Sequence, residues 1–143
     1  DLSVVTVELK NPGKFGRIVR HYENIKAIVE AKDASVETLK IREINTGIYL
    51  VKADILKTYL PGIKNQNAQN EYYLTDIVSA CVEAGKRVTA ISAPKHVAMG
   101  VNTQQELSEA SRWIFKRNAR KAMEAGVIII DPRATYIESE VMI

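Results

Sequence analysis

Short apolar runs alternate with amphipathic segments along the chain, and the spacing of the apolar positions predicts the elements. Runs of branched and aromatic residues predict strands, whereas apolar positions that recur every three or four residues predict helices. The strands are expected at residues 3–9, 18–21, 25–31, 47–52, 87–91 and 127–130. The helices are expected at residues 35–43, 54–60, 74–83 and 103–124. Strands that alternate with helices predict an α/β layered fold with a mostly parallel or mixed sheet.

Local signals support several of these boundaries, and one stretch is open to two interpretations. Thr103 and Glu106 have the spacing of a helix capping box, and Gly126 closes the same helix. The stretch "REINTGIYLV" places an amide, a hydroxyl and a glycine (residues 45–47) where a helical pattern gives way to a strand pattern. Both a turn and a pocket for a ligand rich in hydroxyl groups explain these three residues.

Composition, charge and cysteine content narrow the class of protein. The length of 143 residues suits one domain, and 46% hydrophobic with 26% charged residues is typical of a soluble globular protein. No apolar run approaches the roughly 20 residues of a membrane span, so no membrane partner is expected. The single cysteine, Cys81, lies in an apolar run. It is predicted to be a core residue in a reducing, cytoplasmic protein. The net charge of +3 decides little.

The two ends of the chain fall inside extended patterns. Asp1 leads directly into a strand pattern, and Ile143 ends another extended segment. Complete domains rarely begin and end inside strands, because this leaves unpaired edges. A piece of a longer protein is therefore expected.

Several chemical classes lack their motifs. The chain has no phosphate-binding glycine loop and no cysteine and histidine cluster with zinc spacing. A stripe of cationic residues recurs on one side of the last helix, at Arg112, Lys116 and Arg120. A solvated face is the preferred interpretation. A nucleic-acid-binding module is the alternative, although the aromatic interleaving typical of single-strand binders is sparse.

Four polar positions are candidates for ligand binding. Gly16 lacks a Cβ, so its backbone can approach a ligand closely, although a simple turn also explains it. Glu30 ends an apolar strand, and Asn45 carries a carboxamide that both donates and accepts, as a sugar hydroxyl requires. Asn102 precedes the capping residue Thr103, which leaves its side-chain oxygen free for a hard cation. Each residue has an ordinary structural explanation when taken alone.

The order of six blocks along the chain points to one family. The blocks are "NPGKFGRIVR", "AIVEAKDAS", "EINTGIYLV", "NAQNEYYLTDI", "MGVNTQQEL" and "GVIIIDPRATYIE". Together they resemble the bacterial bifunctional N-acetylglucosamine-1-phosphate uridyltransferase/glucosamine-1-phosphate acetyltransferase. The one departure noted is Asn70, where the family usually has glycine.

The resemblance implies a fold and a division of the chain. It implies a Rossmann-like nucleotidyltransferase, with a mixed sheet flanked by helices, present as a partial domain. Residues 1–130 then form the sugar-binding half of that domain. Residues 131–143 begin a left-handed parallel β-helix, in agreement with the hexapeptide spacing of Ile137 and Ile143.

The resemblance also implies roles for the four positions. Gly16, Glu30, Asn45 and Asn102 match residues that bind UDP-N-acetylglucosamine. Asn102 also matches a ligand of the catalytic Mg²⁺, shared with an aspartate that this chain lacks. No catalytic residue is expected within the chain, which should be inactive alone.

The reaction implied joins UTP and N-acetylglucosamine 1-phosphate into UDP-N-acetylglucosamine, a precursor of peptidoglycan and lipopolysaccharide. The implied assembly is a homotrimer formed through a β-helix outside this chain, with no nucleic acid bound. Two alternatives stay open: a related sugar-nucleotide pyrophosphorylase of other specificity, and a non-catalytic module that binds a ligand or nucleic acid.

Overall fold

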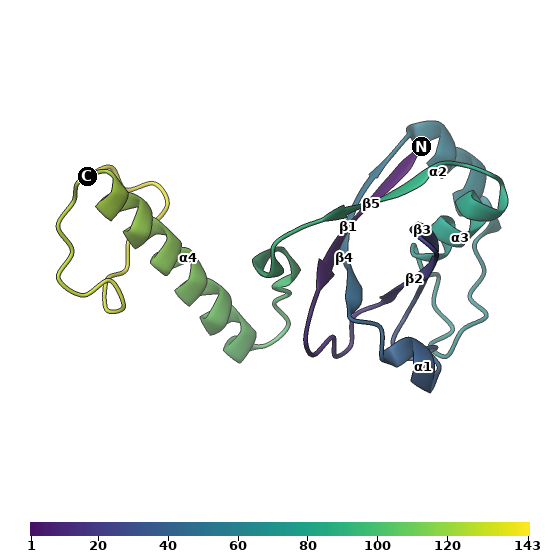
Figure 1. Cartoon of the computed structure of the whole chain (residues 1–143), viewed down its shortest axis with the longest axis horizontal. Coiled ribbons are helices and arrows are strands. Elements are labelled where there is room, and N and C mark those ends of the chain that lie inside the picture. Colours follow the sequence, from purple (N-terminus) through teal and green to yellow (C-terminus); the bar gives the residue numbers. More distant parts are fainter. The chain divides into compact units, whose positions relative to one another are not determined.

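The computed structural model describes all residues from 1 to 143, and they form two compact units, Asp1–Ala98 and Met99–Ile143. The first unit contains the strands and three helices, and the second contains one long helix (Figure 1). The strands are β1 (Leu2–Glu8), β2 (Arg17–His21), β3 (Asn24–Val29), β4 (Glu43–Val51) and β5 (Val88–Ser92). The helices are α1 (Val36–Leu39), α2 (Ala53–Tyr59), α3 (Asp76–Glu83) and α4 (Gln104–Glu124). Two short 3₁₀ turns are η1 (Leu60–Gly62) and η2 (Lys95–Ala98).

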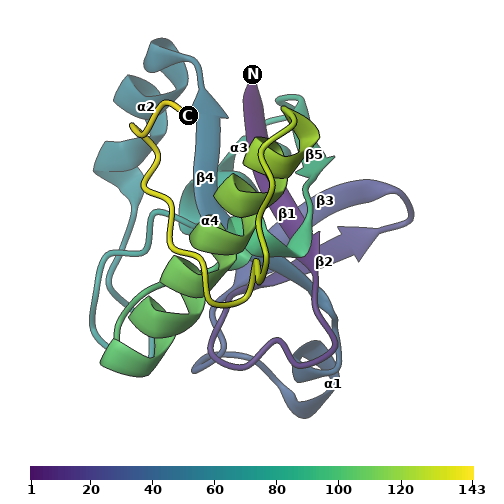
Figure 2. The same ribbon diagram turned by 90° about the vertical axis from the view of Figure 1, so that its left-hand side faces the viewer.

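The five strands form one mixed sheet in the order β3-β2-β4-β1-β5. β1 pairs antiparallel with β4 and parallel with β5, and β2 pairs antiparallel with both β3 and β4. Figure 2 shows the β2–β3 hairpin extending beside the other strands. The mixed sheet confirms the predicted α/β class.

The main hydrophobic core lies between one face of this sheet and the helices α2 and α3. Ile18 and Ile28 from the sheet pack in one cluster with Ile55 of α2 and Ile77 of α3. Cys81 is fully buried in the same cluster, as predicted. A smaller cluster covers the opposite face of the sheet. Its residues are Val7, Ile44 and Ala98, with Phe15 packed against them.

β4 begins at Glu43, four residues earlier than predicted, and contains an expanded bulge. Residues 46–48 of β4 lie opposite the single residue Val5 of β1, between the pairs Thr6↔Asn45 and Val4↔Tyr49. The bulge has its own hydrogen bonds. The Gly47 backbone N–H donates to Asn45 Oδ1 at 3.0 Å, and Thr46 Oγ1 donates to the Val5 carbonyl at 2.8 Å. Gly47 has a φ of 81°, which glycine adopts without a steric cost.

This bulge corrects the sequence-based interpretation of residues 35–47. The helix predicted to run to residue 43 ends at Leu39, so α1 has a single turn. The amide, hydroxyl and glycine do not open the strand but lie within it, because side-chain hydrogen bonds replace the ladder bonds that the bulge interrupts.

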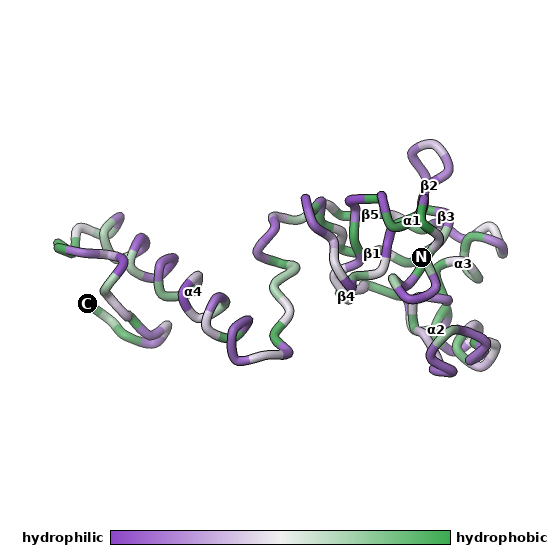
Figure 3. Tube along the Cα trace, turned by 90° about the horizontal axis from the view of Figure 1, so that it is seen from below, coloured by the Kyte–Doolittle hydropathy of each residue, from purple (hydrophilic) through white to green (hydrophobic).

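The second unit consists of α4 and the segment that folds back along it. Thr103 and Glu106 form the predicted capping box. Asn118 Nδ2 donates to the Ile137 carbonyl at 2.9 Å, and the rings of Phe115 and Tyr136 meet edge to face at 5.3 Å. Figure 3 shows hydrophilic and hydrophobic positions alternating along α4. No helix of the structure is long and apolar enough to cross a membrane.

The strand predicted at residues 127–130 is wrong. No strand is present between 127 and 143, and Ile128 and Ile130 are 92% and 100% exposed. A strand needs a neighbour for its backbone hydrogen bonds, and none pairs with this apolar run. The start of a β-helix at 131–143, and the division at residue 130, stay predictions.

Candidate functional site

The register of the sheet places Gly16 and Glu30 side by side. Arg17 of β2 pairs with Val29 of β3, so the preceding Gly16 lies opposite the following Glu30. A Cβ atom built on Gly16 lies 3.2 Å from both carboxylate oxygens of Glu30 and 3.1 Å from Ile28 Cγ2. The Glu30 side chain therefore leans over the glycine, in space that any other residue would fill.

Asn45 lies on the other side of the same glycine. Its backbone N–H donates to the Gly16 carbonyl at 2.9 Å, which continues the β2–β4 pairing by one residue. Asn45 is 9% exposed. Three neighbouring strands thus bring Glu30, Gly16 and Asn45 into one row across the sheet. The row continues through the cross-strand partners Thr6 and Ser92. Polar or small residues in such a row share one face, because side chains alternate along strands.

The hydrogen-bonding character of the two polar side chains is opposite. Asn45 Oδ1 accepts from Gly47, and the amide Nδ2 of Asn45 carries two N–H donors. An ionised Glu30 carboxylate is purely an acceptor. A hydroxyl-rich ligand lying over Gly16 can therefore donate to Glu30 and accept from Asn45.

The loop before Gly16 is held by a buried arginine. Arg17 is 3% exposed, and its guanidinium donates to the carbonyl of Phe15 and, at 3.0 Å, to that of Gly13. These bonds fold residues 11–16 back on the start of β2. Gly16 is therefore positioned by side-chain hydrogen bonds as well as by the sheet.

Two tyrosines near Glu30 were missed from the sequence. The hydroxyl oxygens of Tyr49 and Tyr73 are buried and have no hydrogen-bond partner in normal geometry. Burial raises the pKa of Tyr49 to about 12; the Asn45 side chain opposes the rise and the charge of Glu30 adds to it. Burial also raises the pKa of Tyr73, and the charges of Asp33 and other nearby acids add to the rise. Both hydroxyls are hydrogen-bond donors at neutral pH.

The loop at residues 64–75 is attached to the turn that follows Glu30. The backbone N–H of Ala68 donates to Asp33 Oδ1 at 2.7 Å, and the N–H of Asp33 donates to the Glu30 carbonyl at 3.0 Å. Asn70 has a φ of 55°, a conformation that glycine and asparagine tolerate best. This explains in physical terms why asparagine replaces the usual family glycine there.

Asn102 belongs to the second unit, so it is described separately from the other three positions. Its backbone N–H donates to Glu106 Oε2 at 2.8 Å, and the Thr103 N–H donates to the same oxygen at 2.9 Å. The capping task is therefore performed by Thr103 and Glu106, as predicted. No group of three or more acidic, histidine or cysteine side chains gathers to hold a metal ion anywhere in the chain.

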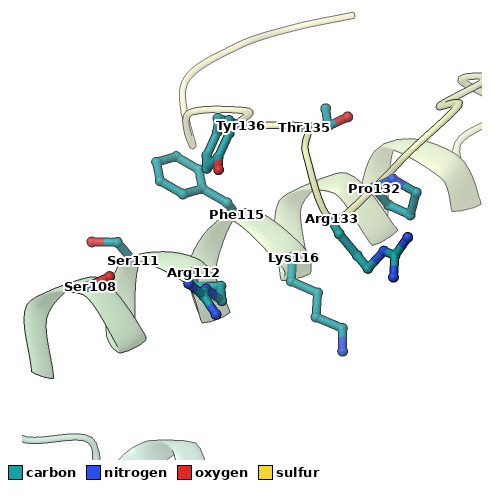
Figure 4. A pocket seen from close by; sticks show the side chains of 9 residues that line it. All are labelled: Ser108, Ser111, Arg112, Phe115, Lys116, Pro132, Arg133, Thr135 and Tyr136. Atoms are coloured by element: carbon teal, nitrogen blue, oxygen red, sulfur yellow. The ribbon is translucent and has the colours of Figure 1, made fainter. Parts of the chain in front are cut away.

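The cationic residues on α4 make several separate local contacts. Arg120 forms an ion pair with Glu124 at 2.9 Å, and the Arg117 guanidinium lies 5.2 Å from the Trp113 ring centre. Arg112 and Lys116 line a cavity of about 450 Å³ between α4 and the segment 132–136 (Figure 4). The three cationic residues of the stripe, Arg112, Lys116 and Arg120, are exposed, as predicted for a solvated face.

Comparison with solved structures identifies the fold class. The crystal structure of a Bacillus anthracis protein, assigned as a glucose-1-phosphate thymidylyltransferase and bound to sucrose, matches 92% of this chain with a TM-score of 0.54. The match covers 46% of that protein, and 19% of the aligned residues are identical. The chain therefore has the fold of a nucleotidyltransferase, present as a partial domain.

Sequence comparison shows that the chain, over its whole length, is similar to one segment of the proteins named bifunctional protein GlmU. It is 59% identical to the Bdellovibrio bacteriovorus protein of that name over 143 residues, 100% of this chain and 31% of the relative. It is 44% identical to the Carboxydothermus hydrogenoformans protein and 46% identical to the Syntrophotalea carbinolica protein, over 99% of this chain in both cases. The chain thus spans about a third of the length of these relatives. No protein-family profile matches the chain.

Proposed function

We propose that the row formed by Glu30, Gly16 and Asn45 is the sugar-binding wall of a uridyltransferase site. The reaction joins UTP and N-acetylglucosamine 1-phosphate into UDP-N-acetylglucosamine, with release of pyrophosphate. The observation that carries this proposal is the adjacency of the three groups: the carboxylate lies 3.2 Å from the Cβ position of Gly16, whose carbonyl accepts from Asn45.

Each residue of the row has a distinct task. Glu30 accepts hydrogen bonds from sugar hydroxyls, and the Asn45 amide donates to a sugar oxygen. Gly16 leaves the backbone bare between them, so the sugar ring lies close to the sheet. All three residues orient the sugar and take no part in bond breaking. A misplacement of about 1 Å at the reacting atoms lowers a rate by roughly a hundredfold, so groups that break no bond still control turnover.

The chemical step takes place at the phosphate groups of the two substrates. A phosphate oxygen of the sugar 1-phosphate attacks the α-phosphorus of UTP, and the bond to pyrophosphate breaks. The groups that bind the nucleotide are supplied from outside these 143 residues. The chain alone, in this proposal, binds the sugar and does not turn over.

Asn102 is proposed as one oxygen ligand of a magnesium ion. Its side chain makes no hydrogen bond within the cap, because Thr103 and Glu106 form that motif. Amide and carboxylate oxygens suit Mg²⁺, and the second protein ligand is an aspartate outside this chain. When bound, the ion neutralises charge on the transferring phosphates. The residues of this chain fit a shared metal site rather than a complete one.

The proposal extends to the biological setting. It assigns the chain to a cytoplasmic enzyme that makes a precursor of peptidoglycan and lipopolysaccharide. It also includes assembly as a homotrimer through a β-helix beyond these residues.

The test transfers this segment into a relative. The Bdellovibrio bacteriovorus protein is 59% identical over the segment, so its corresponding residues can be replaced by this chain. We expect the chimera to form UDP-N-acetylglucosamine, and Glu30→Gln to raise KM for N-acetylglucosamine 1-phosphate about tenfold. Lys32→Gln is the matched control, because it changes a neighbouring charge outside the row. Wild-type KM in Glu30→Gln contradicts the proposal.

The same chimera tests the alternative substrates. Glucose 1-phosphate with UTP, and N-acetylglucosamine 1-phosphate with dTTP, are offered at equal concentrations. A higher kcat/KM for either competing pair than for the proposed substrates favours a related pyrophosphorylase of other specificity.

A further inference from the structure

The hydroxyl group of Tyr49 has no partner in a place where a partner is expected. Its oxygen is buried and has no hydrogen-bond partner in normal geometry, although the ring packs against the main core. A buried hydroxyl without a partner destabilises a fold, and phenylalanine at this position avoids that cost. The sequence nevertheless has tyrosine here.

The bulge in β4 determines what lies near this hydroxyl. Tyr49 pairs with Val4, and Asn45 pairs with Thr6, so a single residue of β1, Val5, lies between their partners. Three residues of β4 lie opposite Val5, because 46–48 form the bulge. Val4 and Thr6 lie on one face of β1, and their partners on β4 share that face. The bulge therefore brings Tyr49 next to Asn45 on the face that carries the row.

The charges near the hydroxyl fix its hydrogen-bonding role. Burial raises the pKa of Tyr49 to about 12 and the negative charge of Glu30 adds to the rise, so the phenol stays protonated at neutral pH. The Asn45 side chain lowers the pKa of Tyr49, which is the effect of an amide that donates toward the phenol oxygen and leaves the phenol proton without a partner. The structure gives the Tyr49 proton no acceptor, and a bound ligand can supply one.

We propose that Tyr49 is a further sugar-binding residue, whose hydroxyl donates a hydrogen bond to an oxygen of the sugar held by Glu30 and Asn45. The inference rests on the proposed function of that row. In this arrangement Asn45 and Tyr49 donate to the ligand while Glu30 accepts from it. The hydroxyl costs stability in the free protein and contributes affinity in the complex.

The experiment compares Tyr49→Phe with Tyr59→Phe in the chimera. Tyr59 packs against the same core, and its hydroxyl is not buried without a partner, so it is the matched control. For Tyr49→Phe we expect KM for N-acetylglucosamine 1-phosphate to rise about tenfold, equivalent to about 1.4 kcal/mol. We expect a smaller change in kcat and a thermal unfolding midpoint, without ligand, that is unchanged or higher. Tyr59→Phe should keep the KM of the parent.

A binding role for the Tyr49 hydroxyl predicts that Tyr49→Phe lowers sugar affinity without lowering stability, whereas a structural role predicts a loss of stability. A KM equal to that of the parent overturns the inference, and so does a rise in KM that accompanies a lower unfolding midpoint. Glu30→Gln, measured in parallel, separates this inference from the proposed function. If Glu30→Gln raises KM and Tyr49→Phe does not, the row binds sugar without Tyr49. If neither variant changes KM, both proposals fail.

Discussion

Replacement of Gly16 by alanine adds one methyl group to the row and so tests whether its geometry controls sugar binding. The new Cβ lies 3.2 Å from both oxygens of Glu30 and 3.1 Å from Ile28 Cγ2. Ordinary contacts are 3.4 Å or longer, so the carboxylate must move by a few tenths of an ångström. If the hundredfold loss for about 1 Å scales with displacement, a shift of about 0.3 Å costs roughly fourfold in rate. The methyl group also occupies space that the ligand needs, which brings the expected rise in sugar KM to about tenfold.

The effect of this substitution on stability is expected to be small. Contact with Ile28 overpacks the edge of the core and costs about 1 kcal/mol. Alanine also restricts the unfolded chain, which stabilises the folded state by up to about 1 kcal/mol. This gain applies because the φ of Gly16 is not positive, so alanine adopts the same backbone conformation. The two contributions nearly cancel, so the unfolding midpoint should change by a few degrees at most.

The assay measures KM and kcat of the chimera with N-acetylglucosamine 1-phosphate, together with thermal unfolding. Gly62→Ala is the matched control, since a Cβ there meets nothing within 4 Å and its φ is not positive. It should keep the KM of the parent. If Gly16→Ala and Gly62→Ala behave alike in KM, Glu30 and Gly16 do not act together on a sugar.

Three further predictions follow from contacts elsewhere in the structure. Asn45→Asp keeps the oxygen that accepts from Gly47 and loses the amide donors. Its KM for the sugar 1-phosphate should rise strongly, while its unfolding midpoint stays near that of the parent. Asn45→Ala loses both groups and should lower both affinity and stability. Arg20 hydrogen-bonds both oxygens of Glu43 at 2.7 Å and holds the pKa of that carboxyl below its ordinary value. This contribution is fully present above about pH 4.5 and is lost as the pH falls through the lowered value, so Glu43→Gln should flatten the acid side of the stability curve by at most about 1 kcal/mol. The double variant Arg112→Gln, Lys116→Gln should leave UDP-N-acetylglucosamine formation unchanged; salt-dependent binding of a random oligonucleotide that this variant abolishes would support the nucleic-acid alternative.

The sequence was sufficient for the elements whose signals are local. The capping box at Thr103 and Glu106 fixed the start of α4, and runs of branched apolar residues located the strands β2 and β3. The adjacency of Glu30, Gly16 and Asn45 is a property of strand register. The sequence marked each residue as a candidate for ligand binding without showing which strands are neighbours.

The bulge and the two tyrosines lay beyond sequence reasoning for a physical reason. A bulge has no hydrophobic period of its own, so Asn45, Thr46 and Gly47 are equally consistent with a turn. Tyr49 reads as an ordinary core aromatic, because its ring packs in the core and only its oxygen lies near Glu30. A tyrosine two residues after an Asn-Thr-Gly sequence is a signal that can be sought in other sequences.

The apolar run at residues 127–130 shows the opposite failure. Val127 to Ile130 have the composition of a buried strand, but composition does not supply a partner. Ile130 is fully exposed in the second unit. Pairing is a long-range property, and the pattern alone predicts only that such a segment is suited to it.

A crystal structure of the Bdellovibrio bacteriovorus chimera with N-acetylglucosamine 1-phosphate tests the role of the row most directly. We expect the sugar ring over Gly16, a Glu30 carboxylate oxygen within about 3 Å of a sugar hydroxyl, and Asn45 Nδ2 within about 3 Å of another sugar oxygen. A sugar bound elsewhere in the protein, with Glu30 and Asn45 in contact only with solvent, would contradict this assignment.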